Sequence, residues 1–82
     1  MKILAIGQLT GEDITPHLEE EQRVAAELRQ GGFILDSFRK RDRSGAILLL
    51  NETDAAAAER HLVMLPFVER NLIKFELVEL AD

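Results

Sequence analysis

The sequence predicts a small α+β fold in which four strands and two helices follow one another in the order β-α-β-β-α-β. The chain of 82 residues is 46% hydrophobic and 30% charged, a composition typical of one packed domain, here residues 1–82. Four apolar segments have the length of strands, and the two segments that separate them carry helix start and stop signals. No linker or internal repeat interrupts this order.

The first strand and the first helix are recognised by their composition and by their ends. Residues 2–9 are mostly apolar and form the expected first strand. Thr15 is in position to cap a helix whose first residue is Pro16, because proline loses no hydrogen bond there. The glutamates at 19–21 favour the positive N-terminal end of that helix, and the glycines at 31–32 end it.

A hairpin is expected in the middle of the chain. Residues 33–40 are predicted to be the second strand, and residues 46–50 are an uninterrupted apolar third strand. The segment 41–45 between them is polar, contains Gly45 and is typical of a turn.

The second helix is predicted from its alanines. Thr53 or Asp54 can cap it, and the alanines at 55–58 have high helix propensity. Pro66 is expected to end the helix. The side chains spaced to form its buried stripe are Ala58, Leu62 and Leu65.

The last strand completes a ferredoxin-like arrangement. Residues 72–80 alternate, with an apolar face formed by Ile73, Phe75 and Leu77 and a second face formed by Lys74, Glu76 and Val78. Two β-α-β halves joined through a central hairpin give a four-stranded antiparallel sheet with both helices on one face.

The other face of this sheet is expected to be apolar as well. The third strand is apolar on both faces, and the first strand has Leu4 and Ile6 on one side and Ile3 and Ala5 on the other. Exposed apolar patches of this kind mark interaction surfaces. The simplest cover is a second copy of the chain, so the sequence predicts a homodimer or a larger homo-oligomer.

Charge and cysteine content exclude several functional classes. The net charge of −5 disfavours nucleic acid as a partner, and the basic segment 39–43 has no Tyr or Trp beside it to stack on bases. The absence of cysteine excludes disulfides and thiolate chemistry and fits the cytoplasm. The first apolar run is too short for a signal peptide or a membrane span, so no membrane partner is expected.

Part of the chain resembles a known family. From the glycines at 31–32 to the closing Met64-Leu65-Pro66-Phe67, the chain resembles the muconolactone isomerases, which belong to the dimeric α/β barrel proteins. The segment Pro16-His17-Leu18 is similar, more weakly, to the YCII-related proteins. The first resemblance implies a proton shift between carbon atoms of a small unsaturated lactone. Such a reaction needs a base, an acid and a group that holds a carboxylate.

Four residues are candidates for these roles. Arg39 falls where the isomerases have arginine and could bind a substrate carboxylate through two hydrogen bonds, although it could equally be a solvated turn residue. Asp36 replaces a family histidine and is a candidate base, or else an edge-strand carboxylate that faces water. His17 could transfer a proton, or be a surface histidine. Glu21 falls where the family has an acid, but it also complements the helix dipole.

No cofactor is predicted. The two histidines lie far apart in sequence, which does not fit a metal site, and no glycine-rich phosphate loop connects a strand to a helix. Two functions therefore remain open. One is an isomerase acting on a small lactone or carboxylate-bearing ring compound, and the alternative is a non-catalytic ligand-binding or structural oligomer. A cofactor-free oxygenase ranks last, because four phenylalanines provide little aromatic surface for a polycyclic substrate.

Overall fold

The computed structural model describes residues 2–81 and confirms the predicted β-α-β-β-α-β order. Two short helices are added to it. The elements are β1 (Lys2–Leu9), the 3-10 helix η1 (Thr15–His17), α1 (Leu18–Gln30), β2 (Ile34–Arg39), β3 (Ala46–Leu50), α2 (Ala55–Leu62), α3 (Pro66–Glu69) and β4 (Ile73–Leu80).

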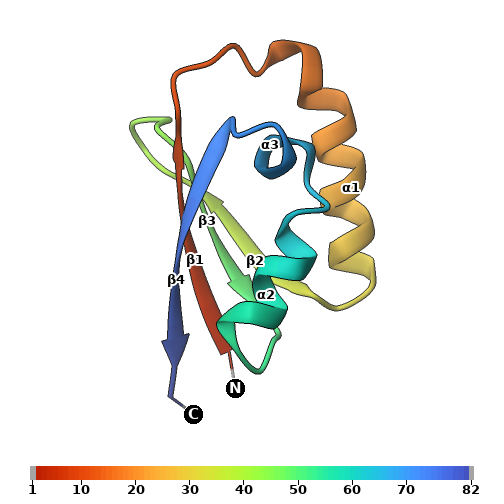
Figure 1. Ribbon diagram of the computed structural model, residues 1–82, viewed down its shortest axis with the longest axis vertical. Coiled ribbons are helices and arrows are strands. Elements are labelled where there is room, and N and C mark those ends of the chain that lie inside the picture. The colour runs from red at the N-terminus through yellow and green to blue at the C-terminus, as the bar shows by residue number, and fades with distance from the viewer. Residues whose placement is uncertain (1, 82) are drawn as a thin grey trace.

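The four strands form one sheet in the order β2-β3-β1-β4, and every neighbouring pair is antiparallel. The topology is therefore ferredoxin-like, with β2 and β4 at the two edges. Figure 1 shows α1, α2 and α3 on the same side of this sheet. The core lies between the helices and the sheet. Its most buried large side chains are Ile3, Leu50 and Leu65.

The helix starts agree with the sequence in one case and differ in the other. Asp54 caps α2, since its Oδ1 accepts a hydrogen bond from Ala57 N at 2.8 Å. Thr15, expected to cap α1, instead begins η1, and α1 starts three residues later at Leu18. Asp13 holds this 3-10 turn, because its Oδ1 accepts a hydrogen bond from Thr15 N at 3.0 Å.

Pro66 has a different role from the one predicted. α2 already ends at Leu62, and Pro66, which was expected to end that helix, begins α3. The fixed φ of proline suits the first position of a helix, and its missing N–H has no partner to lose there. The predicted buried stripe of α2 is confirmed, because Ala58, Leu62 and Leu65 are all buried.

Two glycines allow β1 to lie against the turn between β2 and β3. A Cβ atom on Gly45 would lie 1.8 Å from the carbonyl oxygen of Gly7. Leu9 N, further along β1, donates a hydrogen bond to Ser44 O at 2.7 Å. This close approach requires a residue without a side chain at position 45.

The side of the sheet opposite the helices is called the bare face. The predicted alternation is present, because Ile3 and Ala5 are fully buried while Leu4 and Ile6, on the bare face, are only half-buried. The register places Leu4 beside Leu49 and Val78, and Ile6 beside Ile47. Phe38, opposite Ile47, is 58% exposed. Apolar side chains of all four strands thus meet on a surface that no helix of residues 2–81 covers (Figure 1).

Candidate functional site

A cleft of about 700 Å³ lies between α1 and the helix side of the sheet. This volume is in the range of small-molecule sites, which run from roughly 300 to 1,000 Å³. Most of its lining is apolar and comes from both layers, for example Leu18, Ala25, Leu48, Phe67 and Phe75. Six polar side chains interrupt this lining, namely those of Glu21, Gln22, Arg29, Ser37, Arg39 and Arg43.

Glu21 is the acidic group of the cleft. It lies on α1, where its half-buried side chain reaches across to α3, and its Oε1 accepts a hydrogen bond from Phe67 N at 2.8 Å. Burial raises the pKa of Glu21, and the hydrogen bond from Phe67 N opposes this rise only in part. A carboxyl group with a raised pKa is a stronger base when ionised and holds its proton closer to neutral pH. Glu21 is therefore the group of the cleft that is best suited to moving a proton.

Three arginines supply positive charge to the same cleft. Arg29 comes from the last turn of α1 and donates a hydrogen bond to Ser37 Oγ on β2. Arg39 is the last residue of β2, and Arg43 lies in the following turn with φ of 63°. In a chain with a net charge of −5, this cluster is a local concentration of positive charge, which attracts anions.

The turn that carries Arg43 is held by its own polar side chains. Asp42 Oδ1 accepts a hydrogen bond from Ser44 N at 2.9 Å. Hydrogen bonds from the side chain and the backbone of Ser44 lower the pKa of Asp42, so this carboxylate stays ionised within the turn. The turn is further tied to β1 by the hydrogen bond from Leu9 N to Ser44 O.

Topology brings Glu21 and Arg39 to the same half of the molecule. β1 and β2 run in the same direction, since both are antiparallel to β3. The chain leaves the end of β1 and enters η1 and α1 there, so the first turns of α1 and the end of β2 lie in the same half of the molecule, in different layers (Figure 1). The acidic group and the first candidate anchor both line the cleft, Glu21 from α1 and Arg39 from β2.

The residues that the sequence singled out do not all meet in this cleft. Arg39 lines it. Asp36 pairs with Leu49 in the sheet and so lies on the bare face, where it is exposed and accepts a hydrogen bond from Ser37 N at 2.9 Å. His17 ends η1 and is not among the lining residues. Of the residues singled out, Arg39 and Glu21 thus line one cleft, and Asp36 and His17 do not.

One signal in the sequence could have placed Glu21 in the cleft. Glu21, Ala25 and Leu28 have the spacing i, i+4, i+7, which is the spacing of a single helix face. Ala25 and Leu28 belong to the apolar side of α1. A glutamate in line with them is expected to point toward the sheet, whereas its neighbours Glu19 and Glu20 are exposed.

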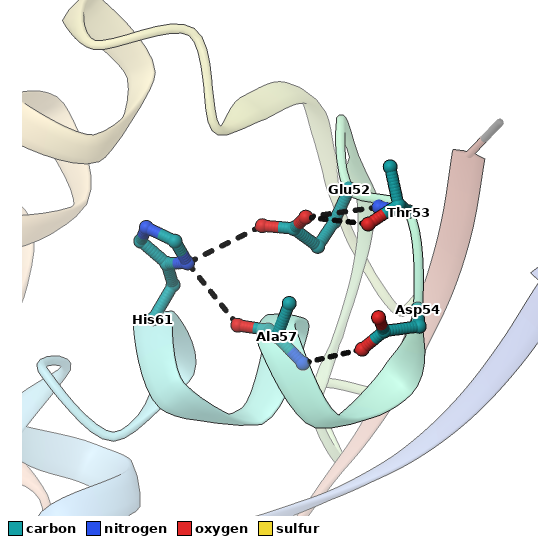
Figure 2. Close-up of polar contacts among 5 residues, drawn as sticks. All are labelled: Glu52, Thr53, Asp54, Ala57 and His61. Atoms are coloured by element: carbon teal, nitrogen blue, oxygen red, sulfur yellow. Dashed lines mark hydrogen bonds and ion pairs between the residues drawn. The ribbon is translucent and has the colours of Figure 1, made fainter.

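A second polar cluster lies at the start of α2, apart from the cleft (Figure 2). His61 Nδ1 lies 3.1 Å from Ala57 O and 3.4 Å from Glu52 Oε2. The imidazole ring stacks on Phe33, with 4.5 Å between the ring centroids. Glu52 also accepts a hydrogen bond from Thr53 N at 2.9 Å. These contacts tie α2 to the segments that precede β2 and follow β3, so we assign them to the fold.

Residues 2–81 contain no group of three or more histidine, cysteine or carboxylate side chains placed to hold a metal ion. Within the same residues, no helix has the length and apolar character that crossing a membrane requires.

Two comparisons with known proteins find no match to this chain. No protein-family model matches it, and no curated protein matches it. The ferredoxin-like topology is a property of the structure itself.

Proposed function

We propose that the cleft between α1 and the sheet binds a small, largely apolar compound with a carboxylate, and that the protein shifts a proton on it as muconolactone isomerases do. One observation carries this proposal. Glu21, whose pKa is raised by burial, lies in the same apolar cleft as Arg39, Arg29 and Arg43. Such a substrate needs a cation to bind its carboxylate and a base to move its proton. The arginines can supply the first and Glu21 the second.

The reaction needs no co-reactant. Arg39 holds the substrate carboxylate, and the apolar lining excludes water from the ring. Ionised Glu21 takes a proton from a ring carbon, the electron pair moves into the conjugated system, and Glu21 returns the proton to another carbon of the same molecule. The product is an isomer of the substrate, so atoms and charge balance. Asp36 and His17, the proton-transfer residues predicted from the sequence, would need a rearrangement to take part.

The first test compares two neighbouring arginines. Arg39→Ala should weaken binding of muconolactone by roughly 10- to 100-fold, because charged hydrogen bonds of about 1.5–3 kcal/mol are lost. Arg41→Ala is the matched control, since Arg41 is exposed in the turn that follows β2 and does not line the cleft. Titration calorimetry measures both affinities, and circular dichroism checks that each variant is folded. Equal binding by the two variants would refute the role of Arg39.

The chemical step has its own test. In D₂O, the wild-type protein should exchange ring protons of muconolactone for deuterium, which NMR detects. Glu21→Gln keeps an oxygen that can accept the Phe67 N–H but cannot take up a proton, so exchange should stop while binding remains. Continued exchange would assign the proton transfer to another group.

A non-catalytic role as a ligand-binding or structural oligomer is the second candidate. The bare face favours it, because Phe38 and Val78 are 58% and 36% exposed there and an isologous partner would cover them. Under this proposal two copies pack face to face in the cytoplasm, in keeping with a chain that has no cysteine. Light scattering that reports twice the chain mass, together with no proton exchange on muconolactone, would favour this function over the first.

A further inference from the structure

β4 is the longer and more regular of the two sheet edges. It spans eight residues, and its register with β1 runs without a break from Leu9↔Ile73 to Lys2↔Leu80. β2, at the opposite edge, is shorter and its register shifts between Ile34 and Asp36. Irregular and short edge strands resist pairing with another chain, whereas a long regular edge is a template for it.

The hydrogen bonds of β1 show which backbone groups of β4 point outward. Thr10 N donates to Leu72 O at 3.0 Å, which places this pair at a hydrogen-bonded position of the ladder. In an antiparallel ladder such pairs alternate, and the next ones along the register are Gln8↔Lys74 and Ile6↔Glu76. The backbone N–H and C=O groups of Phe75 and its odd-numbered neighbours therefore face the free edge.

The charges beside Phe75 select one way of pairing two copies of this edge. Lys74 and Glu76 are exposed, lie on the bare face, and have no ion-pair partner among residues 2–81. A two-fold axis at Phe75 sets Lys74 of each copy opposite Glu76 of the other, which gives two opposite-charge pairs. An axis at Lys74 or Glu76 would set like charges opposite each other, and an axis at Leu77 would pair Glu76 with Val78. Opposite charges across two strands stabilise their pairing, and like charges oppose it.

An apolar groove lies beside the same edge on the helix side. It has a volume of about 460 Å³, and its lining includes Leu62 and Val63 of α2, Val68 of α3, and Phe75 of β4. In the arrangement with the axis at Phe75, the helix-side chains of the second β4 lie next to this groove. Val63, 51% exposed in the single chain, would gain apolar neighbours there.

We propose that two copies of this chain pair antiparallel through β4, with a two-fold axis at Phe75, to form one continuous eight-stranded sheet. The two Phe75 residues exchange backbone hydrogen bonds, and so do Ile73 and Leu77 of opposite copies. Lys74 and Glu76 form two ion pairs across the bare face. This contact uses the backbone edge of β4 and does not depend on the proposed chemistry, although the side chains of Ile73 and Phe75 also line the cleft.

Single cysteines test the register directly, because the chain has no cysteine of its own. Residues 74 and 76 of opposite copies would be a pair without backbone hydrogen bonds, with Cα atoms about 4.5 Å apart, which a disulfide can span. The Cα atoms of residue 74 in the two copies would be about 8 Å apart, which is too far for a disulfide. An oxidised mixture of Lys74→Cys and Glu76→Cys chains should therefore form linked dimers, and each variant alone should form few. The mixed dimer also keeps one of the two ion pairs.

Charge reversal gives a second, independent readout. Glu76→Lys should weaken the dimer roughly tenfold or more in sedimentation equilibrium, since both cross-strand pairs become repulsive. The exchanged double variant, Lys74→Glu with Glu76→Lys, restores two opposite-charge pairs and should recover the affinity. Both positions are exposed, so the fold should be retained, and circular dichroism checks it.

Three results would overturn the proposal. The first is a mixture that links no better than the single variants. The second is a double variant that dimerises as weakly as Glu76→Lys. The third is a wild-type chain that is monomeric at high concentration, as expected if this edge receives a strand from a different protein.

Discussion

Removing the Glu21 carboxylate tests the contact that joins α1 to α3 at the cleft. Glu21→Ala leaves Phe67 N, part-buried at 2.8 Å from its present acceptor, without a hydrogen bond from the protein. A hydrogen bond to a charged group contributes about 1.5–3 kcal/mol to stability. Burial of Glu21 opposes this gain, as its raised pKa shows, and the site is partly exposed. We therefore expect the free energy of unfolding to fall by about 1–2 kcal/mol, lowering Tm by roughly 4–15 °C in a domain of this size.

The conservative variant separates the hydrogen bond from the charge. Glu21→Gln keeps an oxygen acceptor for Phe67 N, so its stability should lie within about 0.5 kcal/mol of wild type near pH 4. The folded pKa of Glu21 is raised, so the folded state binds this proton more tightly than the unfolded state. The contribution of protonated Glu21 to stability is present below the ordinary glutamate pKa, and it is lost as pH rises through the raised pKa of the folded state. The wild type should therefore lose stability relative to Glu21→Gln across that interval.

Urea unfolding at pH 4 and pH 8 measures these differences. If the m-values are equal, the unfolding midpoints of the wild type, Glu21→Ala and Glu21→Gln can be compared directly. The reasoning is refuted if Glu21→Ala is as stable as Glu21→Gln at both pH values. It is also refuted if the wild type gains stability relative to Glu21→Gln as pH rises, because that would mean a lowered pKa in the folded state.

Two further predictions concern the frame around the site. Gly45→Ala should destabilise the protein by about 1–3 kcal/mol, because its Cβ would lie 1.8 Å from Gly7 O and the turn must move away from β1. Gly31→Ala is its control, since a Cβ there meets its nearest atom at an ordinary 3.5 Å, and equal stability of the two variants in thermal unfolding would contradict the packing argument. Asp54→Ala should cost about 1 kcal/mol through loss of the cap on Ala57 N, and Asp54→Asn should recover most of it. If both Asp54 variants lose their helix content at the same temperature, the cap does not stabilise α2.

The sequence by itself determined the elements whose signals are local. The bounds of β1 and β3 match the apolar segments, and the cap of α2 is a polar residue followed by alanines. Alternation along β4 also separated Ile73 and Phe75 from Lys74, and the register with β1 then puts the first two on the helix side. Each of these patterns is complete within a few neighbouring residues, so no knowledge of the rest of the chain is needed.

The tertiary structure alone decided where the candidate groups meet. Asp36 lies on the bare face because of the register shift after Ile34, and a shift of one residue exchanges the two faces of a strand. Glu21 finds its hydrogen-bond partner, Phe67 N, 46 positions further along the chain, at the start of a helix that Pro66 begins. Such contacts form only when α1 and α3 pack on the same sheet. The burial of Glu21, and hence its raised pKa, follows from that packing.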